Sequence, residues 1–336
     1  MSNLKEILLN KKPCKLIWFM RQAGRYLPEF RKIRTENKNF IKLCMNSSLA
    51  SEITLQPIKR FDLDAAIIFS DILIVPYALG QDVTFKESEG PKLSRFDSKI
   101  FLKTSEKEFS KKLAPIYKAI ELTRKKLNKK KSLISFVGAP WTLIIYMLGL
   151  KKENNQLNTK KFKELENDLD TILSNLINFL FLHIKNQINA GSDVVQIFDS
   201  WAGLLPENKI KSYCYEPNAE LVSLCKNSQI PTICFPKGIN RQYKDFNILV
   251  KPDGINLDPD IDPEWAKQKL KNVVLQGGLD PKILLKTEEE IMLGATKYIK
   301  TFTDIPYVFN LGHGLLPETE PDKVEKLIKY YRNFNG

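Results

Sequence analysis

Short apolar runs that each end in a polar or turn-forming residue recur along this 336-residue chain, and they constrain its fold more than any other feature. Segments with the apolar spacing of helices lie between them, and strands that alternate with helices form parallel βαβ units. Seven runs are clear, at residues 64–71, 133–140, 193–200, 231–236, 253–258, 272–280 and 306–314. "LIWF" (16–19) is the best candidate for an eighth strand. The pattern predicts a single (β/α)8 barrel domain over residues 1–336, an architecture that typically needs about 250 residues.

In such a barrel the active site lies in the loops at the carboxyl ends of the strands, here called the mouth. The residues just beyond the predicted strands are mostly polar and are therefore the first candidates to line it. They are Asp71, Pro140 with Trp141, Ser200, Lys237, Asp258, Asp280 and His313. An Asp or Ser at a strand–helix junction is often an ordinary helix cap, so the sequence alone leaves both interpretations open for each residue.

Arginine is concentrated in one segment, "MRQAGRYLPEFRKIR" (20–34). Only nine of the 52 lysines and arginines are arginine, and four of those nine lie here. Arginine offers a rigid planar fork that grips a carboxylate or phosphate through two hydrogen bonds, and it tolerates burial better than lysine does. We therefore expect Arg21 and Arg25 to bind such groups at the mouth. Surface ion pairs explain Arg31 and Arg34 at least as well.

The local pattern around these arginines predicts a loop followed by a helix. Gly24 argues against a continuous helix, and Pro28 can occupy the first turn of a helix that begins there. Further helices are predicted from apolar periodicity at 162–188 and 287–300. Arg21 and Arg25 then lie on a loop that can fold over the mouth.

The net charge of +13 is compatible with nucleic acid, a membrane surface or a polyanionic small molecule as partner, but the lysines are scattered, which favours a generally basic surface. Five cysteines form no C-x-x-C motif and are odd in number, so we expect free thiols in a reducing compartment. The N-terminus lacks the apolar core of a signal peptide, and the most apolar stretch (173–184) contains Ser, Asn and His. The sequence predicts a cytoplasmic enzyme with no membrane insertion.

Two segments carry a family resemblance. "WFMRQAGRYLPEFRKIR" (18–34) and "GAPWTLIIY" (138–146) resemble the two signatures of the uroporphyrinogen decarboxylase family. Shorter matching segments follow in family order over essentially the whole chain, at 62–80, 198–203, 276–281 and 310–317. The resemblance implies a single (β/α)8 domain that pairs as a homodimer with the two mouths facing.

The resemblance also implies an activity. The enzyme would remove the four acetate carboxyls of the tetrapyrrole uroporphyrinogen III as carbon dioxide, giving coproporphyrinogen III in porphyrin and haem biosynthesis. No cofactor and no metal are expected, because a protonated pyrrole can accept the electrons that the departing carboxyl leaves behind. A substrate with eight carboxylates would explain the concentration of arginine forks.

Roles for individual residues follow from the same resemblance. Asp71 is expected to accept hydrogen bonds from the pyrrole N–H groups and to stabilise the cationic ring. Arg21 is expected to bind carboxylates and to lie near the proton transfer, although its high pKa makes it a poor acid. Substrate contacts are expected for these two residues and for Gln22, Arg25, Arg34, Tyr146, Phe198, Ser200 and His313. A core role for Phe198 is comparably compatible with the sequence.

The two histidines are distinguished by their surroundings. His183 falls in the middle of an apolar helical run and is interpreted as a core residue. His313 lies in "NLGHG" (310–314), between glycines that expose it, and is the better functional candidate.

Two segments depart from the family pattern. "MLGLKKENN" (147–155) replaces an acidic residue and glycines that often follow the family's tyrosine, so this loop is expected to close differently. Asn256 and Leu257 stand where the family commonly has Asp-Trp, and no role is assigned to either.

A corrinoid-linked methyltransferase of a related barrel family is the nearest alternative. Its zinc would need histidine and cysteine ligands clustered at the mouth. No cysteine lies beside His313, and the cysteines do not follow the predicted strands as a set. The alternative is therefore disfavoured.

A basic nucleic-acid-binding protein is the alternative from another class. "RKKLNKKK" (124–131) is the only dense basic run, and it lies at a predicted helix end, where lysines also complement the helix dipole. No nucleic-acid motif accompanies it, so no nucleic-acid partner is expected.

Overall fold

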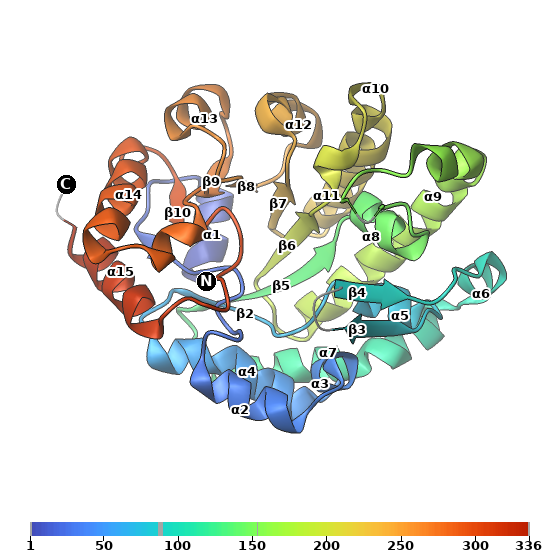
Figure 1. Ribbon diagram of the computed structural model, residues 1–336, viewed down its shortest axis with the longest axis horizontal. Helices are drawn as coiled ribbons and strands as arrows, with labels where there is room; N and C mark the ends of the chain where they lie inside the picture. The colour runs from blue at the N-terminus through green and yellow to red at the C-terminus, as the bar shows by residue number, and fades with distance from the viewer. Residues whose placement is uncertain (1, 87–89, 153, 335–336) are drawn as a thin grey trace.

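The computed structural model describes residues 2–86, 90–152 and 154–334. Eight parallel strands form one sheet in the order β1-β10-β9-β8-β7-β6-β5-β2. The strands lie at the centre and helices surround them, which is a (β/α)8 barrel and confirms the predicted fold class (Figure 1). The strands are β1 Leu16–Ile17, β2 Ala65–Ile67, β5 Ser132–Gly138, β6 Val194–Asp199, β7 Thr232–Pro236, β8 Gly254–Leu257, β9 Val274–Gly277 and β10 Tyr307–Phe309.

Seven of these strands lie inside the runs identified in the sequence, including the weak candidate at 16–19, and β5 begins one residue before its run. Nearly all of their residues are buried, since helices cover the outside of the sheet while side chains fill the inside. The helices between or after the strands are α2 Pro28–Glu36, α3 Phe40–Cys44, α4 Ser47–Arg60, α5 Ile74–Ala78, α6 Ser98–Lys103, α7 Glu106–Lys126, α8 Pro140–Met147, α9 Thr159–Asn189, α10 Glu207–Ile210, α11 Glu216–Asn227, α12 Tyr243–Val250, α13 Pro263–Lys269, α14 Glu288–Thr301 and α15 Pro321–Asn333.

Local sequence signals set several helix boundaries. Helix α2 begins at Pro28, as predicted, because its missing N–H is not needed in the first turn. Thr287 caps α14 with a reciprocal contact to Glu290, so this helix begins one residue after the predicted start. Helix α9 contains the predicted segment 162–188 and extends it slightly at both ends. Among the described residues, no helix has the length and apolarity needed to cross a membrane.

The barrel interior is closed at the end opposite the mouth by helix α1 (Asn3–Asn10). Leu4 and Leu8 have almost no exposed surface and join the apolar cluster that fills the inside of the strands. The Leu4 N–H donates to Ser132 Oγ at 3.0 Å. An added side chain on Gly254 would stand 2.9 Å from a Leu8 methyl group, so α1 sits directly against β8.

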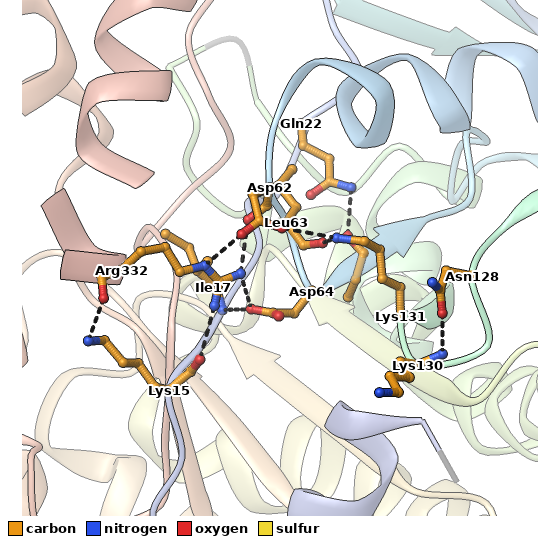
Figure 2. A network of polar contacts seen from close by, with 11 residues as sticks. Lys15, Ile17, Gln22, Asp62, Leu63, Asp64, Asn128, Lys130, Lys131 and Arg332 are labelled. Carbon is orange, nitrogen blue, oxygen red and sulfur yellow. Dashed lines mark hydrogen bonds and ion pairs between the residues drawn. The ribbon is translucent and has the colours of Figure 1, made fainter. Parts of the chain in front are cut away.

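Closure of the barrel between β1 and β2 relies on Asp64, which precedes β2. Its N–H donates to Ile17 O at 2.9 Å, and its carboxylate Oδ2 accepts from Ile17 N at 2.7 Å. Arg332, at the end of α15, donates to the same Oδ2 at 2.8 Å. Lys131 donates to Leu63 O nearby (Figure 2). We call residues 15–17, 62–64, 131 and 332 the lower seam.

The hairpin of β3 (Val83–Lys86) and β4 (Gly90–Leu93) is the element that the strand pattern missed. It is antiparallel and lies outside the barrel, beside α5 in Figure 1. Residues of β4 alternate between exposed and half-buried, so the segment has no continuous apolar run. Its strands therefore resembled loop in the sequence.

Candidate active site

The loop that carries Arg21 is held at the mouth by the segment that follows β10. Met20 donates its N–H to Asn310 Oδ1 at 3.1 Å and accepts from Leu315 N at 3.0 Å. Arg21 itself has a φ of +57°, a left-handed conformation that is unusual for a non-glycine residue. A side chain on Gly314 would stand 2.3 Å from Arg21 Cδ, so only glycine leaves room for the arginine stem. The predicted loop over the mouth is confirmed for this residue.

Arg21 and Arg25 are exposed to water, and among the described residues neither side chain has a hydrogen bond or an ion pair. Protein still surrounds Arg21 closely enough that burial lowers the pKa of its guanidinium, and the charge of Arg25 lowers it further. Asp71 and Tyr146 oppose this shift. The two arginines are thus close to each other and available to an anion.

Arg31 supports the loop instead of facing the mouth. Its guanidinium donates to the carbonyl oxygens of Arg25 at 2.9 Å and Tyr26 at 3.1 Å, which fixes the loop from behind. The nearby Glu29 forms a two-pronged ion pair with Arg60 instead, with both N–O distances 2.9 Å. The alternative interpretation of surface ion pairs is therefore wrong for Arg31.

Asp71 follows β2 and faces the same space. One carboxylate oxygen accepts a hydrogen bond from Leu73 N at 2.8 Å, and no described residue donates to the other. Burial raises the pKa of Asp71 from 3.8 to about 6, while the Leu73 N–H and the charge of Arg21 act in the opposite direction. Near pH 7 the carboxylate is therefore mostly ionised, and it can receive a donor or a cation.

Tyr146 and Phe198 bring aromatic surface to the mouth. Tyr146, on α8, is half-buried, and its ring centroid lies 6.0 Å from that of Trp201. Burial raises the pKa of its hydroxyl, and the charge of Asp71 raises it further while that of Arg21 lowers it. Phe198, on β6, packs edge-on against Phe136 at 5.6 Å and lines the inside of the barrel.

His313 and Ser200 lie at the ends of β10 and β6, and both are half-buried. Burial lowers the pKa of His313 to about 4, and the nearby charges of Lys237 and Arg21 contribute to this shift. The imidazole is therefore neutral near pH 7. His183, in contrast, is fully buried on α9 with its Nδ1 3.0 Å from Tyr117 Oη, which confirms the prediction of a core histidine.

The side chains of Gln22 and Arg34 already form hydrogen bonds within the protein. Gln22 has no exposed surface; its Nε2 donates to Ala65 O at 3.0 Å and its Oε1 accepts from Phe19 N at 3.2 Å. Arg34 donates to Asn37 O, and its Cζ lies 5.7 Å from the ring centre of Phe40. Both residues lie near the loop without presenting free polar groups in the way that Arg21 does.

Two other strand-end acids prove to be structural. Asp258 is almost fully buried and accepts hydrogen bonds from Gly238 N at 2.6 Å and Tyr243 Oη at 2.9 Å. Asp280 accepts from Lys282 N at 2.9 Å and caps the short helix that follows it. These are the helix-cap and turn roles that remained open in the sequence. Pro140 and Trp141 are buried at the start of α8.

Asp199 is the residue that sequence reasoning missed. It is buried at the end of β6, and among the described residues it has no cationic partner. It accepts from Thr142 Oγ1 at 2.7 Å and Asn218 Nδ2 at 3.0 Å, and Thr142 in turn accepts from Trp201 N at 3.0 Å. Burial raises the pKa of Asp199 to about 6. Asp199 links β6 to α8 through Thr142. The sequence feature that could have identified it is its position between the two candidate residues Phe198 and Ser200.

The two segments with unusual sequence have clear positions. In the loop after α8, the Lys151 ammonium lies 4.5 Å from the ring centre of Trp201, beside Tyr146; Glu153 lies outside the described residues. Asn256 is fully buried inside the barrel, where its Oδ1 accepts from Gln276 Nε2 at 2.9 Å. Leu257 belongs to the core.

Metal ligands do not converge in the described part of the chain, where no three His, Cys, Asp or Glu side chains are placed to hold an ion. All five cysteines are free, as predicted, and four of them are buried. Burial raises the pKa of the Cys14 thiol to about 11 and of Cys225 to about 12, so neither is a thiolate near neutral pH. The polar groups available at the mouth include Arg21, Arg25, Asp71 and His313.

Comparison with known proteins assigns nearly the whole chain to one family. The family model for uroporphyrinogen decarboxylase (URO-D) matches residues 8–334. Uroporphyrinogen decarboxylase from Rickettsia bellii is 44% identical over 328 residues, which covers 97% of this chain and 96% of the relative. Uroporphyrinogen decarboxylase from Orientia tsutsugamushi (strain Boryong) is 42% identical, covering 95% of this chain and 94% of the relative.

Solved structures support the fold. A methyltransferase from Methanosarcina mazei superimposes with a TM-score of 0.76 at 14% identity, covering 99% of this chain and 98% of the other. A putative vitamin-B12 independent methionine synthase from Listeria monocytogenes superimposes with a TM-score of 0.57 at 12% identity, covering 97% and 99%. At such low identity these similarities establish the barrel alone.

Proposed function

This chain belongs to the uroporphyrinogen decarboxylase family, and from that premise we propose that it converts uroporphyrinogen III to coproporphyrinogen III in porphyrin and haem biosynthesis. It is a carboxy-lyase that removes the four acetate carboxyls as carbon dioxide. The observation that carries the proposal is the full-length match to curated uroporphyrinogen decarboxylases at 41–44% identity. The arrangement of Asp71 opposite free guanidinium groups supports it from the chemistry.

Loss of carbon dioxide from an acetate side chain leaves an electron pair that needs a sink. Protonation of the neighbouring pyrrole carbon supplies one, because the cationic ring accepts the electrons. The protein has to stabilise that cation, and Asp71 is suited to do so because it is mostly ionised near pH 7 and one of its oxygens has no donor among the described residues. A fixed carboxylate in a partly dehydrated site stabilises developing positive charge strongly.

The cationic loop binds the substrate carboxylates in this proposal. Arg21 and Arg25 grip acetate and propionate groups, and Arg21 lies close enough to Asp71 for their charges to interact. Tyr146 and Ser200 supply neutral hydroxyls, and neutral His313 supplies a further polar contact. Phe198 packs against the macrocycle from inside the barrel.

Gln22 and Arg34 complete the proposed substrate-binding set. Their contribution is best explained through the loop, because Gln22 joins it to β2 through Ala65 O. Arg34 lies on the helix that the loop enters, and its charge acts on Cys44, as does the charge of Asp71. Both residues thus support the loop that carries Arg21 and Arg25.

Several broader features remain part of the proposal. The family resemblance supports a homodimer with facing mouths and a single domain over residues 1–336, and the free cysteines support a cytoplasmic location. No cofactor or metal is required, since the pyrrole is its own electron sink. Sedimentation of the purified protein tests the dimer, and a monomer at micromolar concentration would contradict it.

The activity is tested with purified, EDTA-treated protein and uroporphyrinogen III under anaerobic conditions. We expect carbon dioxide release and stepwise formation of coproporphyrinogen III without added pyridoxal, thiamine or nicotinamide. Absence of decarboxylation by a folded protein would overturn the function. Activity that EDTA abolished and zinc restored would instead overturn the cofactor-free mechanism.

A further inference from the structure

We propose that Lys237 binds a carboxylate of the substrate on the side of the mouth opposite Arg21. This inference rests on the proposed function, and it assigns a binding role to a residue that the family resemblance did not. The ligand class is an acetate or propionate group carried by a polycarboxylate tetrapyrrole. Three observations support the role: how the backbone of Lys237 is held, what its side chain lacks, and where it stands in the barrel.

The backbone of Lys237 is fixed from both neighbouring strands. Its N–H donates to Asp199 O at 3.0 Å, at the end of β6, and its carbonyl accepts from Gly203 N at 2.9 Å. Gly238, the next residue, has a φ of +82° and donates to Asp258 Oδ2, just beyond β8, at 2.6 Å. An added side chain on Gly203 would stand 2.6 Å from Gly238 O, so the two loops touch through their backbones. Lys237 is thus presented from a rigid position.

The ammonium group of Lys237 has no directly bound partner in the described part of the chain. The side chain is half-buried, yet among the described residues no hydrogen bond or ion pair reaches its ammonium group. Asp258 is near enough for the two charges to interact, but no hydrogen bond or ion pair joins them, and its Oδ2 accepts from Gly238 and Tyr243. A half-buried cation without a directly bound counter-ion is unfavourable in the free protein. An anion arriving from outside would relieve that cost.

The position of the Lys237 ammonium group is indicated by the residue whose pKa it shifts. His313 follows β10, and Lys237 is the strongest of the charges that lower the pKa of its imidazole, ahead of Arg21. The Lys237 ammonium is therefore close enough to His313, which follows β10 at the mouth, for its charge to act there. His313 stays neutral mainly because it is buried, and the positive charges of Lys237 and Arg21 add to this effect.

The topology places Lys237 across the barrel from the arginines. In the closed order of eight strands, β7 is four strands away from β1 in both directions. Arg21 and Arg25 follow β1, and Asp71 follows β2, which is next to it. The substrate carries carboxylates around its whole rim, so cations on one wall alone would leave those on the far side unbound. Lys237 supplies a fixed positive charge on that far wall.

The test compares steady-state kinetics for uroporphyrinogen III in wild type, Lys237→Met, Lys237→Arg and the control Lys269→Met. Met keeps most of the apolar stem and removes the charge. Lys269 is exposed at the end of α13, away from the mouth, and its substitution makes the same change in net charge. We expect Lys237→Met to raise KM by roughly tenfold or more, with a smaller effect on kcat. Lys269→Met should leave both unchanged.

Thermal stability and the arginine variant decide between binding and structure. A raised KM in a Lys237→Met protein of normal Tm supports the proposal, and so does recovery of KM by Lys237→Arg if the Met variant is destabilised. An unchanged KM in Lys237→Met overturns it, as does equal impairment of the Met and Arg variants with loss of Tm in both. Inactive wild type would overturn the proposed function instead, so the two failures are distinguishable.

Discussion

The two ends of this barrel differ in how many of their charged side chains are paired. At the lower seam the charged groups are paired: Arg332 binds Asp64, which also accepts from Ile17 N. Arg124 nearby donates to Asp193 and to three backbone carbonyls. At the mouth, Arg21 and Arg25 have no side-chain partner among the described residues, and Asp71 has one donor.

This difference separates stability from function within one chain. A paired charge holds elements together, so its loss leaves the partner unsatisfied and weakens the fold. An unpaired charge in a partly dehydrated site costs stability and is retained where a ligand will complete it. Substitutions at the seam should therefore change the free energy of unfolding, and substitutions at the mouth should change catalysis or binding.

Asp71→Asn should give the largest change. Asparagine keeps the volume and can still accept from Leu73 N, but it removes the negative charge that is proposed to stabilise the cationic ring. The expected loss is roughly 3–4 kcal/mol of transition-state stabilisation, or about two to three orders of magnitude in kcat, with Tm unchanged or slightly raised. Single-turnover rates and thermal unfolding measure both. Asp280→Asn, at a structural cap, is the control and should behave as wild type.

If the Asp71 variant folded normally and turned over substrate at a near-normal rate, Asp71 would be only a turn residue like Asp280. The contrast between the two ends would then lose its main support.

Arg25→Lys should weaken substrate binding while leaving the fold intact. The lysine keeps the charge but cannot form the two-pronged contact, so we expect KM to rise by about 10–50-fold, or roughly 2 kcal/mol. The same substitution at the other end, Arg124→Lys, should lower Tm without changing KM, because it removes contacts to Asp193 and to backbone carbonyls. A change of KM in Arg124→Lys with none in Arg25→Lys would reverse the assignment of the two ends.

Asp64→Asn should act on stability alone. It weakens the hydrogen bonds from Ile17 N and Arg332 that close the barrel, at an expected cost of about 1.5–2 kcal/mol in the free energy of unfolding. Urea unfolding gives this value, and kcat and KM of the folded enzyme should match wild type. A large drop in kcat at unchanged stability would mean that the seam communicates with the mouth.

A fall in pH should produce the smallest effect and should move activity and stability in opposite directions. The pKa of Asp71 is raised from 3.8 to about 6, so in the folded protein it takes up a proton near pH 6, before it would in the unfolded chain. Its contribution to stability therefore grows as the pH falls from about 6 towards 4. Its charge is lost over the same range, so kcat should fall about tenfold between pH 7 and pH 5.

Asp199 has a similar pKa, which makes Asp199→Asn the matched control. This variant should keep the acidic limb of the pH–rate profile, and the residual activity of Asp71→Asn should lack it. If the limb persisted in Asp71→Asn and vanished in Asp199→Asn, the titrating group would be the buried network below the mouth.

The fold was predictable because each barrel strand is a short run of apolar residues between turn residues. Even β1, only two residues long, lies in a recognisable "LIWF" segment. The hairpin β3–β4 was not predictable in this way, since it packs outside the barrel and its β4 residues are half-exposed in alternation. A continuous apolar run indicates a strand that is buried on both faces. A two-stranded hairpin at the periphery is not buried in this way and therefore lacks such a run.

The site was only partly predictable, for a physical reason. Asp71, Asp258 and Asp280 look alike in sequence, because each follows an apolar run. What distinguishes them is their surroundings: Asp280 is exposed, Asp258 is buried and accepts two hydrogen bonds on Oδ2, and Asp71 lies in a buried setting near the charge of Arg21. These surroundings depend on residues brought together only by the fold. Asp199 was missed for the same reason, since its partners lie on α8 and α11.

The position of β1 has a consequence for how the chain folds. Within the described sheet this strand pairs with β10 alone, through Leu16 with Val308 and Ile17 with Phe309, so nearly the whole chain separates the partners. Contacts this distant carry a high entropic cost of loop closure and slow the folding transition. Strands β5 to β10 can pair in order along the chain. In contrast, β1 and the arginine loop that follows it can be fixed only after β10 has formed. Assembly of the mouth and closure of the barrel are therefore expected to occur together, late in folding.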